Sequence, residues 1–147
     1  MTKEHRKEEK VKMANALFDA GRGSFLGGDI DWDANTIKLV FVDHTDDTPL
    51  PASDVALSDI LAAARVATSG AFTGKTETNG VADADDVTVA AVSGDQFESI
   101  VIYKDTGVES TSLLIAFLDT ATGLPCTPNG GSITVQFDSG ANRIFKL

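Results

Sequence analysis

The sequence predicts an all-β protein, an antiparallel β-sandwich or barrel, with a short N-terminal helix and one further short helix. Two observations favour this class. Short stretches rich in β-branched and aromatic residues recur along the chain, and clusters of Gly, Asn and Asp separate them. A parallel α/β fold would also need a long helix after each strand, and no such helical pattern follows these stretches.

The first element is a short helix over residues 14–26. Ala16, Leu17, Ala20 and Phe25 recur at roughly helical spacing, and the Gly pair at 27–28 should end the helix. We expect its apolar side to dock on the sheet.

Residues 37–42 come next and read as a mostly buried strand, because Lys38 is their only charged residue. A loop rich in Asp, Thr and Pro follows over residues 44–51. Residues 57–64 then predict the second short helix, with Ser53 or Asp54 as its N-cap.

The pattern from residue 65 onward is that of consecutive short strands. Gly-, Asn- and Asp-containing turns separate them, and the turn at residues 105–107 predicts a hairpin between the strands on either side. The predicted strands are residues 65–72, 87–92, 99–104, 113–118, 133–137 and 144–147.

The 147-residue chain predicts one β-rich domain over residues 13–147, with residues 1–12 outside it. Residues 1–12 are charged and have no apolar face, so we expect disorder. The codons for Lys7-Glu8-Glu9 can also spell a bacterial ribosome-binding sequence upstream of Met13, which favours a translated leader. The alternative is a basic arm that touches an acidic partner.

The charge balance argues against two classes of partner. The net charge is −10; residues 1–12 carry five basic and three acidic side chains, so the rest of the chain carries −12. Such a body repels nucleic acid and anionic lipid, because phosphates are bound by clustered Lys and Arg. No apolar run approaches the roughly 20 residues that span a bilayer. We therefore expect a soluble protein without nucleic-acid or membrane partners.

Asp29, Asp31 and Asp33 are the candidate metal ligands, because alternating carboxylates resemble the start of a calcium loop. The EF-hand pattern then fails, since Ala34 stands where the loop needs Gly and Val40 where it needs Glu. An irregular calcium site remains one interpretation. The other is a polar edge on which Ile30 and Trp32 point to the core.

The remaining chemistry-bearing residues predict no enzyme and no cofactor. Acidic clusters at residues 43–47 and 83–86 read as solvated turns, although paired carboxylates in a cleft can act as acid and base. A serine, or Cys126, with His44 would be the available nucleophilic pairs, but no Gly-x-Ser-x-Gly motif is present. Cys126 is the only cysteine, so neither an internal disulfide nor a cysteine-based zinc site can form.

Several segments of the chain resemble a family of small tailed-bacteriophage virion structural proteins. The resemblance covers residues 13–147 and leaves out the first twelve. Its segments are ANALFDAGR at 14–22, GDIDWD at 28–33, AARVA at 63–67, GDQ at 94–96, VIYKDTG at 101–107, DTATGLP at 119–125, PNGG at 128–131 and GANRIFKL at 140–147.

The resemblance implies a head or tail component, and no catalytic motif comes with it. An acidic body suits the outer capsid surface, which implies a decoration (cement) protein in the virion that binds the major capsid protein and copies of itself, as in a homotrimer. The alternative is a tail or fibre component that binds a host receptor. A calcium-binding module outside the virion is a third interpretation.

Two apolar segments could make such contacts. The interface candidates are Leu17, Phe18, Phe25, Leu26, Ile144 and Phe145. The strand at residues 144–147 could pair within its own sheet or add to the edge of a neighbour. We favour packing in the protein's own core for both segments, because a small domain needs most of its apolar residues inside.

Overall fold

A five-stranded antiparallel sheet is the centre of the molecule. The computed structural model describes residues 15–147, so the predictions for residues 1–12 lie outside the described residues. The strand order is β1 (Ala16–Leu17), β8 (Leu114–Leu118), β7 (Ser99–Lys104), β2 (Ile37–Val42) and β3 (Arg65–Thr68). Strands β7 and β8 form the hairpin predicted at residues 105–107. β2 and β7 have the predicted boundaries and pair along their whole length.

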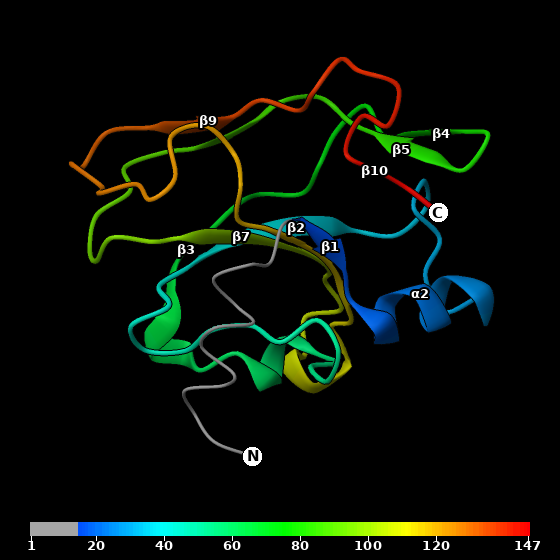
Figure 1. Cartoon of the computed structure of the whole chain (residues 1–147), viewed down its shortest axis with the longest axis horizontal. Helices are drawn as coiled ribbons and strands as arrows, with labels where there is room; N and C mark the ends of the chain where they lie inside the picture. The colour runs from blue at the N-terminus through cyan, green and yellow to red at the C-terminus, as the bar shows by residue number, and fades with distance from the viewer. Residues whose placement is uncertain (1–14) are drawn as a thin grey trace.

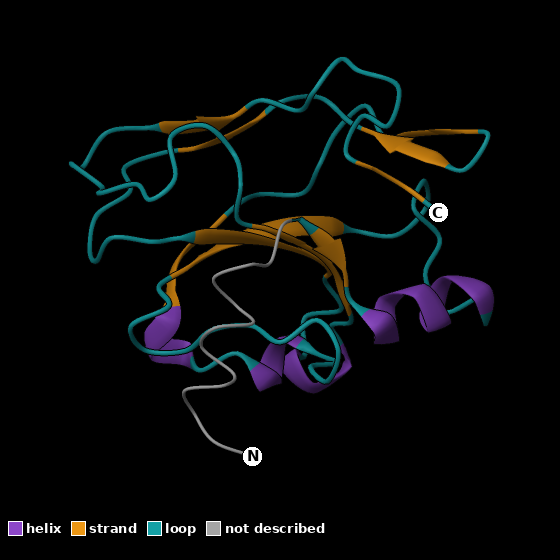
Figure 2. Cartoon of the chain, viewed as in Figure 1, coloured by secondary structure: helices purple, strands orange, loops and turns teal. Residues whose placement is uncertain are grey.

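Two smaller antiparallel sheets cover one face of the central sheet, and short helices cover the other (Figure 1; Figure 2). The small sheets are β10–β5–β4 and β6–β9. Their strands are β4 (Thr76–Thr78), β5 (Val81–Asp83), β6 (Val87–Val89), β9 (Ile133–Val135) and β10 (Phe145–Lys146). The predicted all-β class with little helix is therefore confirmed.

The central sheet has an apolar core on each of its faces. Along β2, Ile37, Leu39 and Phe41 pack under the small sheets, whereas Val40 and Val42 pack on the short helices. This alternation explains why the segment reads as apolar at nearly every position, since neither face meets water.

The N-terminal helix is shorter than predicted. Helix α2 spans Asp19–Leu26, and Ala16–Leu17 pair with β8 as an edge strand instead. Gly21 and Gly23 give the segment little helical propensity, so packing determines where the helix forms. Gly21 lies directly on β8: a Cβ built there would be 2.5 Å from the carbonyl oxygen of Leu114.

The helix predicted over residues 57–64 is wrong, because this segment forms two short 3₁₀-helices, η1 (Leu57–Asp59) and η2 (Ala62–Ala64). The predicted caps are also wrong: the Asp59 carboxylate accepts the N–H groups of Val55 and Ala56, whereas Asp54 accepts that of Leu50. A third 3₁₀-helix, η3 (Glu109–Thr111), packs against η1.

The remaining strands are shorter than predicted, and one hairpin was missed. The predicted strand 65–72 is regular only over Arg65–Thr68, and the Ser69 hydroxyl then accepts the N–H of Leu39. The hairpin β4–β5 turns at Asn79 and Gly80, whose φ angles of +53° and +80° are those of a tight hairpin turn. β10 pairs with β5, so the C-terminal strand joins a sheet of its own chain.

Candidate functional site

The predicted metal ligands Asp29, Asp31 and Asp33 are exposed, and the alternating Ile30 and Trp32 are buried as expected. The Asp31 carboxylate accepts the N–H groups of Asp33 and Ala34, both at 3.1 Å, and so holds a turn. Among residues 15–147, the carboxylates that come close enough to share an ion are a different group.

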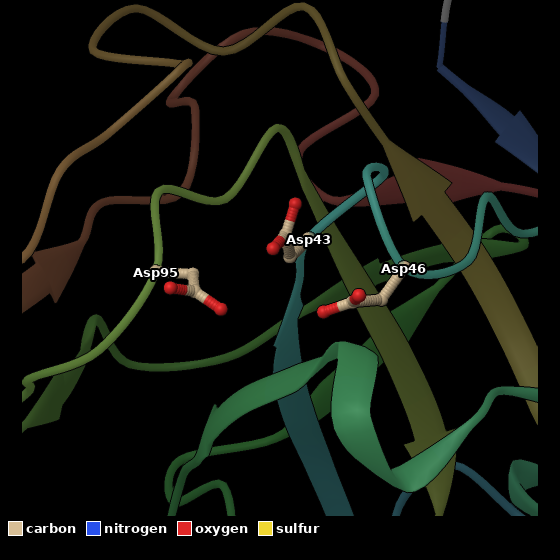
Figure 3. A group of neighbouring side chains, drawn as sticks. All are labelled: Asp43, Asp46 and Asp95. Carbon is tan, nitrogen blue, oxygen red and sulfur yellow. The ribbon is translucent and has the colours of Figure 1, made fainter.

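That group is Asp43, Asp46 and Asp95, which we call the acidic cluster (Figure 3). One oxygen of each carboxylate lies within 4.8 Å of the others. Asp43 follows β2 directly and is only 4% exposed, whereas Asp46 and Asp95 are exposed. One Asp43 oxygen accepts the N–H of Thr45 at 2.8 Å. Carboxylate oxygens suit Ca²⁺, but three of them supply only part of its usual six to eight ligands.

Sequence reasoning found two of the three residues of the acidic cluster, Asp43 and Asp46. The segment 43–47 stood out as acidic, whereas Asp95 appeared only within a turn. The two meet because β2 and β7 pair with Val42 opposite Ser99, which brings the ends of both strands together. The proximity of Asp43 to Asp95 therefore depends on the register between the two strands, which local composition does not reveal.

A serine–histidine pair lies beside this cluster. The Ser99 hydroxyl and the His44 Nε2 are 2.8 Å apart, and the His44 ring stacks on Phe117. The spacing suits proton transfer to a base, but Ser99 is fully buried at the start of β7. In this structure the pair joins two strand ends, and its hydroxyl is out of reach of a substrate.

The interface candidates divide into core residues and one surface residue. Phe18 is fully buried and Leu17 nearly so, which makes both part of the core. Phe25 and Phe145 are half-buried and pack on each other, with ring centroids 5.9 Å apart, and Ile144 packs on the same core. Only Leu26, at 90% exposed, still offers an apolar surface within this set.

A surface that sequence reasoning missed lies beside the three 3₁₀-helices. Val55, Leu61 and Val108 are 45%, 57% and 56% exposed, and we call them the short-helix face. Val55 precedes η1, Leu61 joins η1 to η2, and Val108 precedes η3. No periodicity marks these residues, because each lies at the end of a short element. Exposed acidic residues, Asp59 and Glu109, accompany them.

Arg65 fixes the layer that carries the short-helix face. Its guanidinium donates to the carbonyl oxygens of Leu57 and Ile60 and forms a two-pronged ion pair with Glu109, at 2.8 and 3.0 Å. The same pair holds the pKa of Glu109 below its ordinary value. Such a pair depends on the planar fork of arginine.

A pocket of about 670 Å³ lies between the central sheet and the segment that follows β8. Its floor includes Phe41, Ile100 and Leu118 of the central sheet. Its opposite wall includes Ile133 and Val135 of β9, followed by Phe137. Cys126, Arg143 and several amide and hydroxyl side chains line the remainder. This volume is within the range of small-molecule sites.

Two groups, the buried Tyr103 and the half-buried Asp119, have raised pKa values. Burial, with the nearby Asp105 carboxylate, raises the pKa of Tyr103 to about 12, so its phenol stays protonated at neutral pH. Burial also raises the pKa of Asp119, whose Oδ1 has no hydrogen-bond partner among the described residues. At Asp105 the bond to Lys38, 2.8 Å long, lowers the pKa instead.

Within residues 15–147, no helix is long and apolar enough to cross a membrane. No protein-family model matches the chain, and no curated protein matches its sequence at a significant level.

Proposed function

We propose that this protein is a structural subunit of a bacteriophage virion, a capsid decoration protein that binds the major capsid protein on the outside of the head. The short-helix face is the observation that carries the proposal. Val55, Leu61 and Val108 expose apolar surface on one rigid layer, and the acidic body suits an exterior position. The sequence resemblance to virion proteins supports the same assignment.

Rigidity makes the short-helix face suited to binding. Arg65 and Glu109 already hold η1, η2 and η3 together, so a partner would order few additional side chains. Covering a half-exposed apolar side chain of this size contributes roughly 1 kcal/mol. The acidic residues beside the face predict a capsid surface with basic residues around an apolar centre.

Two finer statements belong to the same proposal. We infer that the central sheet and the small sheets form a β-sandwich, because a single apolar core, which includes Leu17 and Ala116, lies between them. We also infer that the protein assembles as a homotrimer on the capsid, since repeated copies bury apolar area in symmetric contacts.

Binding to capsids that lack the protein tests this function. The capsids come from the phage that encodes it, and sedimentation separates bound from free protein. We expect Leu61→Asp to weaken binding at least tenfold, because it replaces the most exposed apolar side chain of the short-helix face with a charge. Leu26→Asp is the matched control, a leucine exposed on another element, and should bind like the unmodified protein.

The other results would each reject part of the proposal. If Leu26→Asp is the variant that loses binding, the contact lies on helix α2. If the unmodified protein binds host cells and leaves capsids bare, the tail or fibre function replaces the capsid function.

A further inference from the structure

The pocket between the central sheet and the segment after β8 has unfilled apolar walls. In the β6–β9 sheet, Val87 and Val89 of one strand are buried. On the partner strand, Ile133 and Val135 line the pocket and are only half-buried, and Phe137 continues this wall. These apolar side chains point inward but are still in contact with water. A ligand that covers them would therefore gain binding free energy from the hydrophobic effect.

The charged groups of the pocket point to one kind of head group. Within residues 15–147, the pocket is lined by one basic residue, Arg143, and by one acidic residue, Asp138. Arg143 forms an ion pair with Asp83. The distance from the Arg143 Nε to the Asp83 Oδ2 is 3.9 Å, which is too long for a hydrogen bond. In the described part of the chain the guanidinium makes no hydrogen bond, so its donors are free for a ligand.

The backbone at Arg143 is unusual as well. Its φ angle is +47°, a left-handed conformation that residues other than glycine rarely adopt. Strained residues of this kind concentrate at binding sites, where the surrounding structure holds them in place.

We propose that this pocket binds a monocarboxylate with an aliphatic chain, such as a medium-chain fatty acid. The chain lies against the walls of β9 and the central sheet, and the carboxylate meets the Arg143 guanidinium at the rim. A dianion such as phosphate fits less well, because Arg143 is the one basic residue that lines the pocket among residues 15–147, and it supplies a single positive charge. This binding activity is separate from the proposed capsid function, and neither depends on the other.

Cys126 gives the test a built-in reporter. It is the only cysteine of the chain, it lines the pocket, and it is half-buried. Backbone hydrogen bonds in both directions between Cys126 and Phe97 fix its position against the floor. A ligand in the pocket should therefore shield the thiol from a thiol-modifying reagent.

The experiment measures the rate of Cys126 modification in the full-length protein. Decanoate, decanol and decyltrimethylammonium are added in turn, each below the concentration at which it forms micelles. We expect decanoate to slow modification at least tenfold at saturation and to bind at least five times more tightly than decanol. Decyltrimethylammonium should protect least, because its cation faces Arg143.

Variants then show which residues bind the carboxylate of the ligand and which bind its aliphatic chain. Arg143→Gln should reduce decanoate affinity to that of decanol and leave decanol unchanged. Val135→Phe narrows the pocket at its β9 wall and should weaken protection by both. Arg22→Gln removes an exposed arginine on helix α2 and should change neither.

Two results would overturn the proposal. If none of the three compounds protects Cys126, the pocket does not take an aliphatic ligand. If decanoate and decyltrimethylammonium protect equally, the site lacks the carboxylate selectivity assigned to Arg143. Both results come from the unmodified protein, so they do not depend on whether a variant folds.

Discussion

Asp119 shows what a single uncompensated polar atom does to this molecule. The Asn15 amide oxygen accepts the N–H groups of Asp119 and Thr120, so the backbone at the end of β8 is well bonded. The Asp119 Oδ1 is buried and has no hydrogen-bond partner among residues 15–147. Burial of a carboxylate without a partner favours its protonated form, which is why its pKa is raised.

We predict that Asp119→Asn stabilises the protein at neutral pH by at most about 1 kcal/mol, because it removes a charge that is only partly desolvated at this half-buried position. The folded pKa of Asp119 lies above its ordinary value of 3.8, so the folded state binds more protons than the unfolded state. The unmodified protein therefore loses this contribution as pH rises through the two pKa values. The advantage of the variant should be full at pH 7 and disappear toward pH 3.

Urea unfolding between these pH values measures the effect. Asp33→Asn is the matched control, since it removes the same charge from an exposed position and should change stability by less than about 0.5 kcal/mol. Equal effects of the two variants would show that net charge, and not burial of Asp119, is responsible.

At the scale of elements, helix α2 depends on a close approach between two backbones. The helix has weak intrinsic propensity, and its N-terminal end is joined to β8 through the bond from the Phe18 N–H to the Ile115 carbonyl oxygen. Gly21 allows the helix to lie on β8 with no side chain between them. Packing, more than local sequence, holds this helix in place.

We predict that Gly21→Ala destabilises the protein by about 1–3 kcal/mol, because its Cβ would meet backbone atoms of Leu114 and Ile115 that cannot move independently. Gly23→Ala lies two residues further along the helix and has no atom within 4 Å of the added Cβ. It should stabilise the helix by about 0.5–1 kcal/mol, the usual gain from removing a helical glycine. Thermal unfolding measures the stability of both variants. If Gly21→Ala and Gly23→Ala both raised or both lowered the melting temperature, the result would contradict this packing.

The elements that were predictable from sequence are the strands that are covered by other elements on both faces. β2 and β7 are apolar on both faces, and their boundaries follow from composition alone. The segment 57–64 does not form the predicted helix, because Arg65 and Asp47 bind its backbone groups in place of a helical ladder. The Arg65 guanidinium donates to the carbonyl oxygens of Leu57 and Ile60, and the Asp47 carboxylate accepts the N–H of Leu61. The hairpin β4–β5 carried a usable signal in Asn79-Gly80, although its strands are mostly polar.

The candidate sites were less predictable than the fold for a related reason. The acidic cluster joins Asp43 to Asp95 through the register of β2 on β7. The pocket joins Phe41 to Arg143 through the stacking of two layers. Both depend on contacts between distant parts of the chain, which local patterns do not encode.

The whole molecule carries a net charge of −10, and three of its 22 acidic residues lie together in the acidic cluster. We predict that stability rises, on the order of 1 kcal/mol, as ionic strength increases from about 0.01 M to about 0.15 M, because screening weakens repulsion between exposed charges. Urea unfolding in NaCl measures this without adding charge through the denaturant. A fall in stability would mean that ion pairs such as Lys38–Asp105 outweigh the repulsion.

The order of strands in the central sheet also decides when the protein can fold during its synthesis. β1 is the first described strand, yet it pairs only with β8, and β2 reaches its main partner only when β7 has been made. A nascent chain that ends before residue 99 therefore has β2 paired on one side at most, with its apolar residues uncovered. We therefore expect the first half of the protein to stay unfolded until the second half has been synthesised.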